Sequence, residues 1–360
     1  MALHQIIQRL LLLGARIESL PPPPEPEAPP ALVPLIEAIA GPHRRFDQRA
    51  IHYGHRYRSG FWAIYLLSAI AVLFAIMPLA LGWDSKNRLM HPYAALWAIG
   101  EVIVIGTVSV IYSLGHRRDW QSLWLGARTT AELSWYLPML APLLDFNAPR
   151  GDANWYLRVF DPGQHLRGAD DVAELCAAIE PLARRQLAQA WSDPAFVSSY
   201  ARWTVDILEQ QRHYHYRIAH KQHALRHRVH TMNSVLFALT GAGALLHLLI
   251  HSLWLTLVTT FFPALGASLH GALAQSEAYR LGATSERLVA ELQGAMTRIR
   301  AALGAPGVTS DNTATDGAAI DGAANGVAAL KAAIEAAIAL ILEEHQDWHL
   351  LVRPHNLPLA

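Results

Sequence analysis

The chain has 360 residues, of which 52% are hydrophobic and only 16% are charged, with 29 Lys and Arg against 29 Asp and Glu. This balance creates no net positive field, so we expect no nucleic-acid partner. A single cysteine, Cys176, excludes a disulfide framework and a zinc site built from cysteines.

The N-terminal part predicts a helix, a linker and a basic segment. Residues 1–20 have apolar side chains at helical spacing, which predicts an amphipathic helix that packs on the protein or lies on the membrane surface. Residues 21–43 begin with a proline-rich run and predict a linker followed by a short helix. Five arginines come next, and we expect them to contact anionic lipid headgroups: Arg44, Arg45, Arg49, Arg56 and Arg58.

Four long apolar stretches dominate the sequence. Residues 61–83 hold no charge and 93–114 hold only Glu101, and each stretch is long enough to cross about 30 Å of hydrocarbon. Residues 232–250 and 254–275 are a second pair, separated by so few residues that they must form a tight hairpin. We therefore predict an all-α, polytopic membrane protein with two transmembrane hairpins, four spans, and long cytoplasmic helical extensions.

The basic residues predict the orientation of these spans. Lys and Arg are common before the first span, after the second and before the third, whereas the outer loops hold only Lys86 and Arg88. The positive-inside rule then places both termini and the middle region in the cytoplasm of a multi-pass plasma-membrane protein.

The predicted organisation has seven parts, which follow from these stretches and from composition. They are the helix 1–20, the linker and short helix 21–43, the first hairpin with flanking cytoplasmic helices 44–145, a cytoplasmic segment 146–195, a long helix with the second hairpin and a following helix 196–303, a flexible Gly- and Ala-rich linker 304–326, and an Ala-rich helix with a tail 327–360.

Similar helices follow the two hairpins and indicate an internal repeat. The first, DWQSLWLGARTTAEL, and the second, AYRLGATSERLVAEL, align with an offset of 159 residues. The first span matches the third only after about twelve residues are removed. The motif predicts a packing face with a solvated Arg–Glu pair, worth a few tenths of a kcal/mol, or a subunit contact that transmits a signal to the spans. Its residues are Trp120, Trp124, Arg128, Glu132, Tyr279, Arg287 and Glu291.

The segment FDQRAIHYGHRYRSGFWAIYLLSAIAVLFA, followed by the W…W…R…AEL helix, resembles the SLATT proteins. These are the SMODS- and SLOG-associating two-transmembrane effectors of bacterial conflict systems. The resemblance covers roughly residues 46–140, with a weaker copy at 215–300. It implies a bacterial inner-membrane effector whose hairpin forms a pore or perturbs the membrane after a nucleotide-type signal. The chain shows no nucleotidyltransferase signature and no Gly-rich SLOG-like site, so any sensor is a separate protein or the segment 146–195.

Glu101 is the residue of greatest interest in the predicted spans, because a charge at that depth costs from about 2.5 to more than 10 kcal/mol. It is therefore neutral, paired, or in contact with water. One interpretation is a pore-lining or proton-sensitive group in an oligomer. The other is a protonated carboxyl bonded to a neighbouring helix, with Ser68, Thr240 or Thr259 as partner.

The stretch HYHYRIAHKQHALRHRVH, residues 213–230, contains six histidines. Five of them share one helix face with Tyr216, at spacings of three and four, which we call the histidine seam: His213, His220, His223, His227 and His230. Continued into the third span, the seam reaches Ser234, Phe237, Gly241 and Ala244. It predicts a contact surface between helices, a pH-responsive contact, or a transition-metal site.

The chain lacks a Walker A loop, GxGxxG, HExxH, Gly-x-Ser-x-Gly and CxxC, so we expect no enzyme, no cofactor and no resident metal. The first hypothesis is a self-associating membrane effector that forms a pore or disrupts the bilayer and is gated by its cytoplasmic helices. The second is a non-conducting scaffold or assembly protein that binds a partner through its His- and Trp-lined faces. A metal or proton transporter is a third, and the spans offer few polar residues for it.

Overall fold

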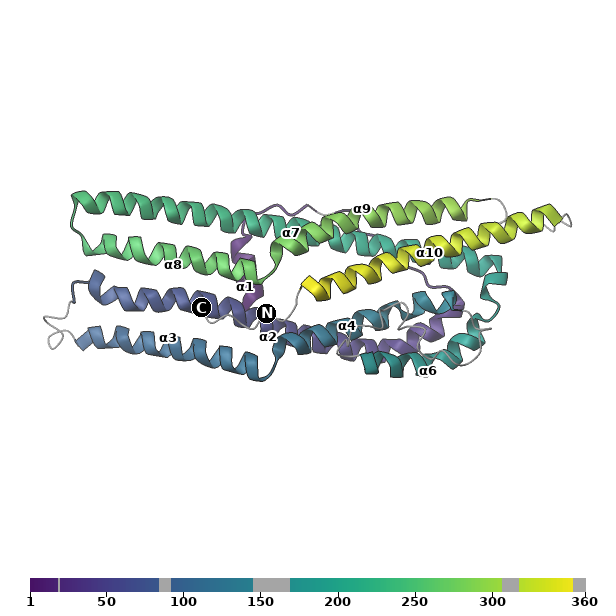
Figure 1. Cartoon of the computed structure of the whole chain (residues 1–360), viewed down its shortest axis with the longest axis horizontal. Coiled ribbons are helices and arrows are strands. Elements are labelled where there is room, and N and C mark those ends of the chain that lie inside the picture. The colour runs from purple at the N-terminus through teal and green to yellow at the C-terminus, as the bar shows by residue number, and fades with distance from the viewer. Residues whose placement is uncertain (19, 84–91, 145–168, 306–316, 352–360) are drawn as a thin grey trace.

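The structure is a computed structural model that describes residues 1–18, 20–83, 92–144, 169–305 and 317–351 (Figure 1). All elements in these ranges are helical, which confirms the predicted all-α class. In chain order the α-helices are α1 (Leu3–Leu11), α2 (Val33–Ala80), α3 (Pro92–Arg117), α4 (Trp120–Leu140), α6 (Ala169–Leu187), α7 (Pro194–Leu249), α8 (Leu253–Gln275), α9 (Ala278–Leu303) and α10 (Gly317–Leu351). Short 3-10 turns lie at Pro30–Leu32, Ala141–Leu143 and Ala190–Ser192.

The molecule consists of two halves with the same succession of helices. In each half a long helix, α2 or α7, extends from a broad helical body to the far apolar end, where the chain turns back into α3 or α8 (Figure 1). Each return helix ends two residues before an acidic residue with left-handed backbone, Asp119 (φ 46°) or Glu277 (φ 52°). The next helix, α4 or α9, then packs along the long helix of its own half. The predicted repeat is therefore present in the architecture.

The apolar parts of four helices lie side by side in one row. The packed neighbours are α7 with α8, α8 with α2, and α2 with α3 (Figure 1). Helices α3 and α7 therefore form the two edges of the row, since neither packs extensively on a second apolar helix. In the part of the chain that the structure describes, this single row leaves both of its faces uncovered and encloses no space.

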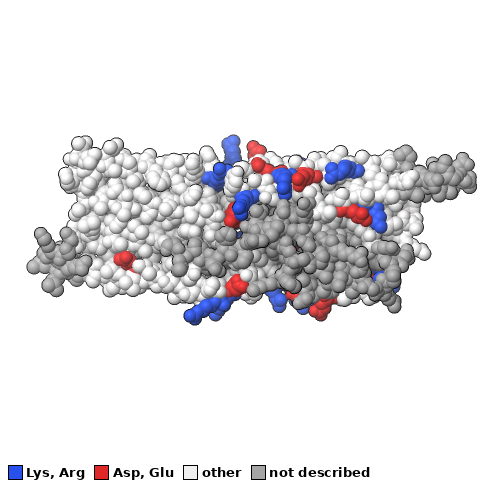
Figure 2. All heavy atoms as spheres, viewed as in Figure 1, with Lys and Arg blue, Asp and Glu red and all other residues white. Residues whose placement is uncertain are grey.

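Several helices are long and apolar enough to cross a membrane. None of the most apolar 18-residue window of α3 is buried, and the windows in α2, α7 and α8–α9 are at most 22% buried. Over this end of the molecule Figure 2 shows almost no charged side chains, whereas Lys, Arg, Asp and Glu gather over the middle and the body. A fifth apolar helix, residues 325–342 within α10, was not predicted as a span, and it packs in the body through Leu330, Ile334 and Ile338.

The helical body has a continuous core built by α4, α6, α9, α10 and the first half of α7. Leu292 and Met296 of α9 are fully buried in it. Tyr200 of α7 is also fully buried, and its hydroxyl donates a hydrogen bond of 2.6 Å to the carbonyl oxygen of Met139. That bond satisfies the one polar group that Tyr200 brings into the core.

The N-terminal segment is less helical than predicted. The amphipathic helix expected over residues 1–20 ends as α1 at Leu11, and Gly14 follows with a left-handed backbone (φ 72°). The chain then runs along α7, where the Leu13 carbonyl accepts from Arg228 (3.3 Å) and the Pro24 carbonyl accepts from Gln210 (3.4 Å). These contacts hold residues 13–18 and 20–24 along α7, and we call these two stretches the N-terminal strap.

Two predicted boundaries were wrong. The short helix expected before residue 44 is the first part of α2, which continues through Pro42 because Leu35 and Ile39 are buried in the core of the body. Helix α10 begins at Gly317, inside the predicted flexible linker 304–326, where the alanines favour helix although three glycines are present. Residues 306–316 of that linker and residues 146–168 of the segment 146–195 lie outside the described residues. The long helix predicted to run from Pro194 into the third span is present as α7.

Candidate functional site

The junction between the apolar row and the body is built around Trp124 of α4, which is 7% exposed. Its ring stacks on Tyr57 of α2 (centroids 5.6 Å apart), and the Arg58 guanidinium lies 4.8 Å from its centroid. Gly54 makes room for this ring, because a Cβ there would lie 2.8 Å from the indole nitrogen. Gln275, at the end of α8, donates to the Tyr57 hydroxyl (3.0 Å). The junction therefore connects α2 and α4 of the first half with α8 of the second half.

Positive charge accumulates at this junction. Among the described residues no carboxylate forms an ion pair with Arg58 or Lys221. Burial, Arg58 and Arg217 together lower the pKa of the Lys221 ammonium. The five predicted lipid-contact arginines are all exposed on α2, and Arg58 also lies over the Trp124 ring.

α1 closes the junction with a histidine that the sequence analysis did not select. His4 is 4% exposed, and its ring nitrogen forms a hydrogen bond of 3.2 Å with the Ser59 hydroxyl. Burial, with smaller contributions from Arg58, His55 and Lys221, lowers the pKa of His4 to about 4. His4 is therefore neutral at physiological pH and acts as a hydrogen-bonding residue.

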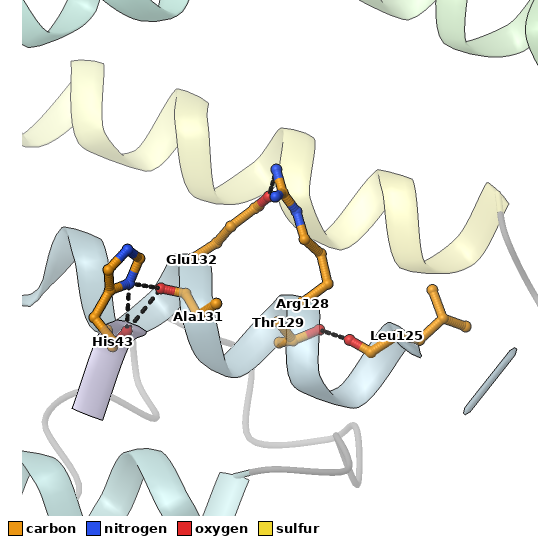
Figure 3. Close-up of polar contacts among 7 residues, drawn as sticks. His43, Leu125, Arg128, Thr129, Ala131 and Glu132 are labelled. Carbon is orange, nitrogen blue, oxygen red and sulfur yellow. Dashed lines mark hydrogen bonds and ion pairs between the residues drawn. The ribbon is translucent and has the colours of Figure 1, made fainter. Parts of the chain in front are cut away.

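The motif helices form the pairs that their spacing predicts. Arg128 and Glu132 form an ion pair on α4, and Figure 3 shows both side chains extending from the same side of that helix. Arg287 and Glu291 form the equivalent pair on α9 at 3.7 Å, in a more exposed position. The two pairs have the same sequence spacing but differ in how far their side chains are exposed to solvent.

The aromatic residues of the motif differ more between the halves. Trp120 is half-buried beside Gly60, whereas its counterpart Tyr279 is 65% exposed and lies under the guanidinium of Arg226, 4.6 Å from its ring centroid. His43, which was not predicted as a site residue, holds α4 to α2 by donating to the Ala131 carbonyl at 2.9 Å (Figure 3).

The histidine seam does not pack as one surface within the chain. Its first part meets the N-terminal strap, since Glu18 accepts from the Tyr216 hydroxyl (3.1 Å) and lies 3.6 Å from the His220 ring nitrogen. His223 pairs with Glu286 of α9 at 3.0 Å but stays half exposed. His227 and His230 are exposed, and His213 is partly buried. Within the described residues the seam therefore meets the strap and α9 at separate points, and the predicted contact along its whole length stays a prediction.

The buried histidine of α7 is His215, which lies off the seam. It is 6% exposed, and its ring nitrogen bonds the Ser285 hydroxyl of α9 (3.3 Å). Burial, and to a smaller extent the charge of Arg128, lowers the pKa of His215 to about 4. Ala219 and Val229 lie further along α7 on the same side of the helix as His215. Both are 1% exposed, so this side is the packed face of α7.

Acid is expected to destabilise the body through His215. Between pH 6.5 and 4 the unfolded chain binds a proton at this ring and the folded chain does not, so the free energy of unfolding falls as the pH drops through this window. The full effect is about 3 kcal/mol, at roughly 1.4 kcal/mol per pKa unit. Thermal unfolding of the detergent-solubilised protein at pH 7.5 and 4.5 measures it.

His215→Gln should reduce this pH dependence, because the glutamine does not titrate. His227→Gln is the matched control, since His227 is exposed on the same helix. An equal reduction in both variants would contradict the assignment to His215.

Glu101 lies on α3, the edge helix of the row. It is partly exposed, and among the described residues no side chain or backbone group bonds its carboxylate. The three partners considered from sequence each bond a carbonyl of their own helix, Ser68 to Ile64, Thr240 to Leu236 and Thr259 to Leu255. The intramolecular hydrogen bond expected as one alternative is therefore absent, since α3 packs on α2 through the preceding residue, Gly100, against Phe74.

Metal-binding and nucleophilic features are few. Within the described ranges no three His, Cys, Asp or Glu side chains converge as a metal site. Burial raises the pKa of the Cys176 thiol to about 12, so this cysteine is a packing residue of α6. Comparisons with protein families, with curated proteins and with solved structures find no match to the chain.

Three residues that organise the junction and the body were missed from sequence: His4, His43 and His215. Each is a single histidine in an otherwise ordinary helical pattern, so neither its burial nor its partner has a sequence signal. The close approach at Gly54 had a weak signal, because glycine is unfavourable inside a helix and often marks a packing contact.

Proposed function

We propose that the chain is a multi-pass protein of the bacterial inner membrane in which α2, α3, α7 and α8 each span the bilayer. A row of four apolar helices with both faces uncovered supports this, because water would leave a large apolar surface exposed. The arginines on the first half of α2 favour a cytoplasmic body, with both termini on that side. The SLATT-like sequence of the first half agrees with the same arrangement.

We further propose that several copies assemble into a pore-forming or membrane-perturbing effector in a conflict or defence system. The observation that carries this proposal is the open row with an unpartnered carboxylate, Glu101, on its edge helix. One chain encloses no passage, so conduction requires copies arranged around a shared space. Glu101 is one residue beyond Gly100 and is thus rotated by about 100° from the α2 contact, toward one face of the row.

The body provides a route for gating. The helices α2 and α7 are continuous from the body into the apolar row, so a movement of the body is transmitted to the spans. The junction at Trp124 and the strap contact at Glu18 are the places where a separate cytoplasmic sensor would act. No cofactor or metal is required in this mechanism.

Ion flux tests the function. The purified chain reconstituted in liposomes is expected to conduct, and Glu101→Gln is expected to lower cation flux about tenfold, which corresponds to roughly 1.4 kcal/mol in the barrier. Removing the carboxylate leaves insertion intact and removes the charge that attracts cations. Glu37→Gln, which removes an exposed carboxylate of the body, is the control and should conduct as the unmodified chain does.

A protein that inserts but never conducts would reject the pore and favour the non-conducting scaffold. The exposed aromatic side chains Trp135 (45%) and Tyr279 (65%) would then be the binding surface to examine.

A further inference from the structure

α3 carries a face that its counterpart α8 uses for packing. α8 lies against α2, where a Cβ at Gly271 would approach the Tyr65 ring to 2.4 Å, and Leu269 is 4% exposed in the same cluster. The 159-residue offset places Val110 of α3 at the position of Leu269, and Val110 is 57% exposed. The equivalent surface exists in both halves and is covered in only one.

Two more pairs of positions agree. Ala272 of α8 is fully buried and Leu265 packs against the same cluster. Their counterparts on α3, Ser113 and Gly106, are both exposed, and no atom lies within 4 Å of a Cβ built on Gly106. The outer face of α3 therefore has small side chains and is uncovered, whereas the equivalent face of α8 is closely packed.

The other edge of the row is α7, and its uncovered surface includes the continuation of the histidine seam. α8 contacts α7 around Asn233 and Gly243. The seam lies on a different side of the helix, and it is exposed from the cytoplasmic junction into the apolar part at His230, Ser234, Phe237, Gly241 and Ala244. Phe237 is 59% exposed, and nothing lies within 4 Å of a Cβ on Gly241.

The order of helices in the row indicates that the two edges can pack on each other in neighbouring copies. Each half contributes its long helix and then its return helix in the same direction along the row, as α7–α8 and α2–α3. Placing α3 of one copy beside α7 of the next repeats the α8–α2 contact that already joins the halves. Such a contact is head-to-tail, uses different surfaces on the two partners, and generates a ring when the rotation closes.

We infer that a second copy of this chain occupies the uncovered edge, with the Gly106, Val110 and Ser113 face of α3 packed on the histidine seam of α7. The inference rests on the proposed function in one respect, namely that α3 and α7 lie in the bilayer. Small residues at Gly106 and Gly241 allow close approach of the helices, as at other membrane helix contacts.

Disulfide cross-linking tests the interface in a chain whose native cysteine is replaced (Cys176→Ala). At about 1.5 Å per residue, Gly106 and Ser234 lie roughly 21 and 23 Å from the outer ends of α3 and α7. The double variant Gly106→Cys/Ser234→Cys in native membranes, oxidised with copper phenanthroline, should give dimers and higher multiples on a non-reducing gel. Each single variant should stay monomeric, and a mixture of the two single variants should stop at dimers.

The control pair is Val104→Cys/Ser234→Cys, because Val104 is four residues from Gly100 and lies on the side of α3 that faces α2. Both cysteine positions of the test pair are exposed, so neither substitution creates a clash, and circular dichroism verifies the fold. Absence of cross-links in the double variant overturns the interface, and so do single variants that cross-link alone or a control pair that links equally well.

Flux of the same proteins in liposomes separates this inference from the proposed function. Cross-links without flux retain the interface and reject the pore. Flux without cross-links retains the pore and rejects this interface.

Discussion

Substitution of Val102 by lysine is expected to prevent α3 from inserting into the membrane. Val102 is 69% exposed and lies roughly 15 Å from the outer end of α3, near the middle of a hydrocarbon layer about 30 Å thick. A lysine at the centre of a span costs on the order of 2.5–3.5 kcal/mol on insertion scales, and Glu101 beside it already carries part of such a cost. The amount of protein in the membrane fraction after alkaline carbonate extraction measures the effect.

The same substitution distinguishes a membrane helix from an exposed helix in water. In a water-soluble protein an exposed valine tolerates lysine with an effect within about 0.5 kcal/mol. Ile51→Lys is the matched control, because Ile51 is 50% exposed on the part of α2 that belongs to the body. If Val102→Lys and Ile51→Lys yield equal amounts of membrane-inserted protein, α3 does not lie in hydrocarbon.

Leu292→Ala is expected to destabilise the helical body by about 2–5 kcal/mol, the usual cost of an empty space left by a buried leucine. Leu292 is fully buried on α9 and belongs to the core that also contains Met296 and Leu208. The loss should appear as a lower midpoint in thermal unfolding followed by circular dichroism in detergent.

Leu245→Ala removes the same atoms from the apolar end of α7, where the side chain is 68% exposed. Detergent or lipid fills the vacated space there, so its unfolding midpoint should match that of the unmodified chain. A Leu245→Ala variant as unstable as Leu292→Ala would show that this part of α7, which lies off the histidine seam, has protein neighbours.

The histidine seam shows where sequence reasoning stopped. The spacing of His213, His220 and His227 placed them on one face of a helix, and α7 is helical throughout that stretch. The partner of that face could not be derived, because carboxylates of both the N-terminal strap and α9 lie within reach of it. The structure assigns Glu18 to one part and Glu286 to another, and it buries His215, which the pattern left aside.

The repeat is a second case. The 159-residue offset between the motif helices predicted similar halves, and both halves indeed have a long helix, a return helix and a left-handed acidic residue before the motif helix. The order of the halves in the row, with α8 against α2, depends on contacts such as Tyr65 with Gly271 that the offset does not encode.

The sequence by itself determined the helical class, the positions of the four apolar stretches and the Arg–Glu pairs, because hydrophobicity and helical spacing are local properties of the chain. The tertiary structure alone decided which of these helices are edges, that Glu101 has no partner among the described residues, and that α10 is a core helix although it is as apolar as a span. Burial and pairing depend on contacts between residues far apart in the chain. Several packings satisfy the same local pattern, and only the coordinates distinguish between them.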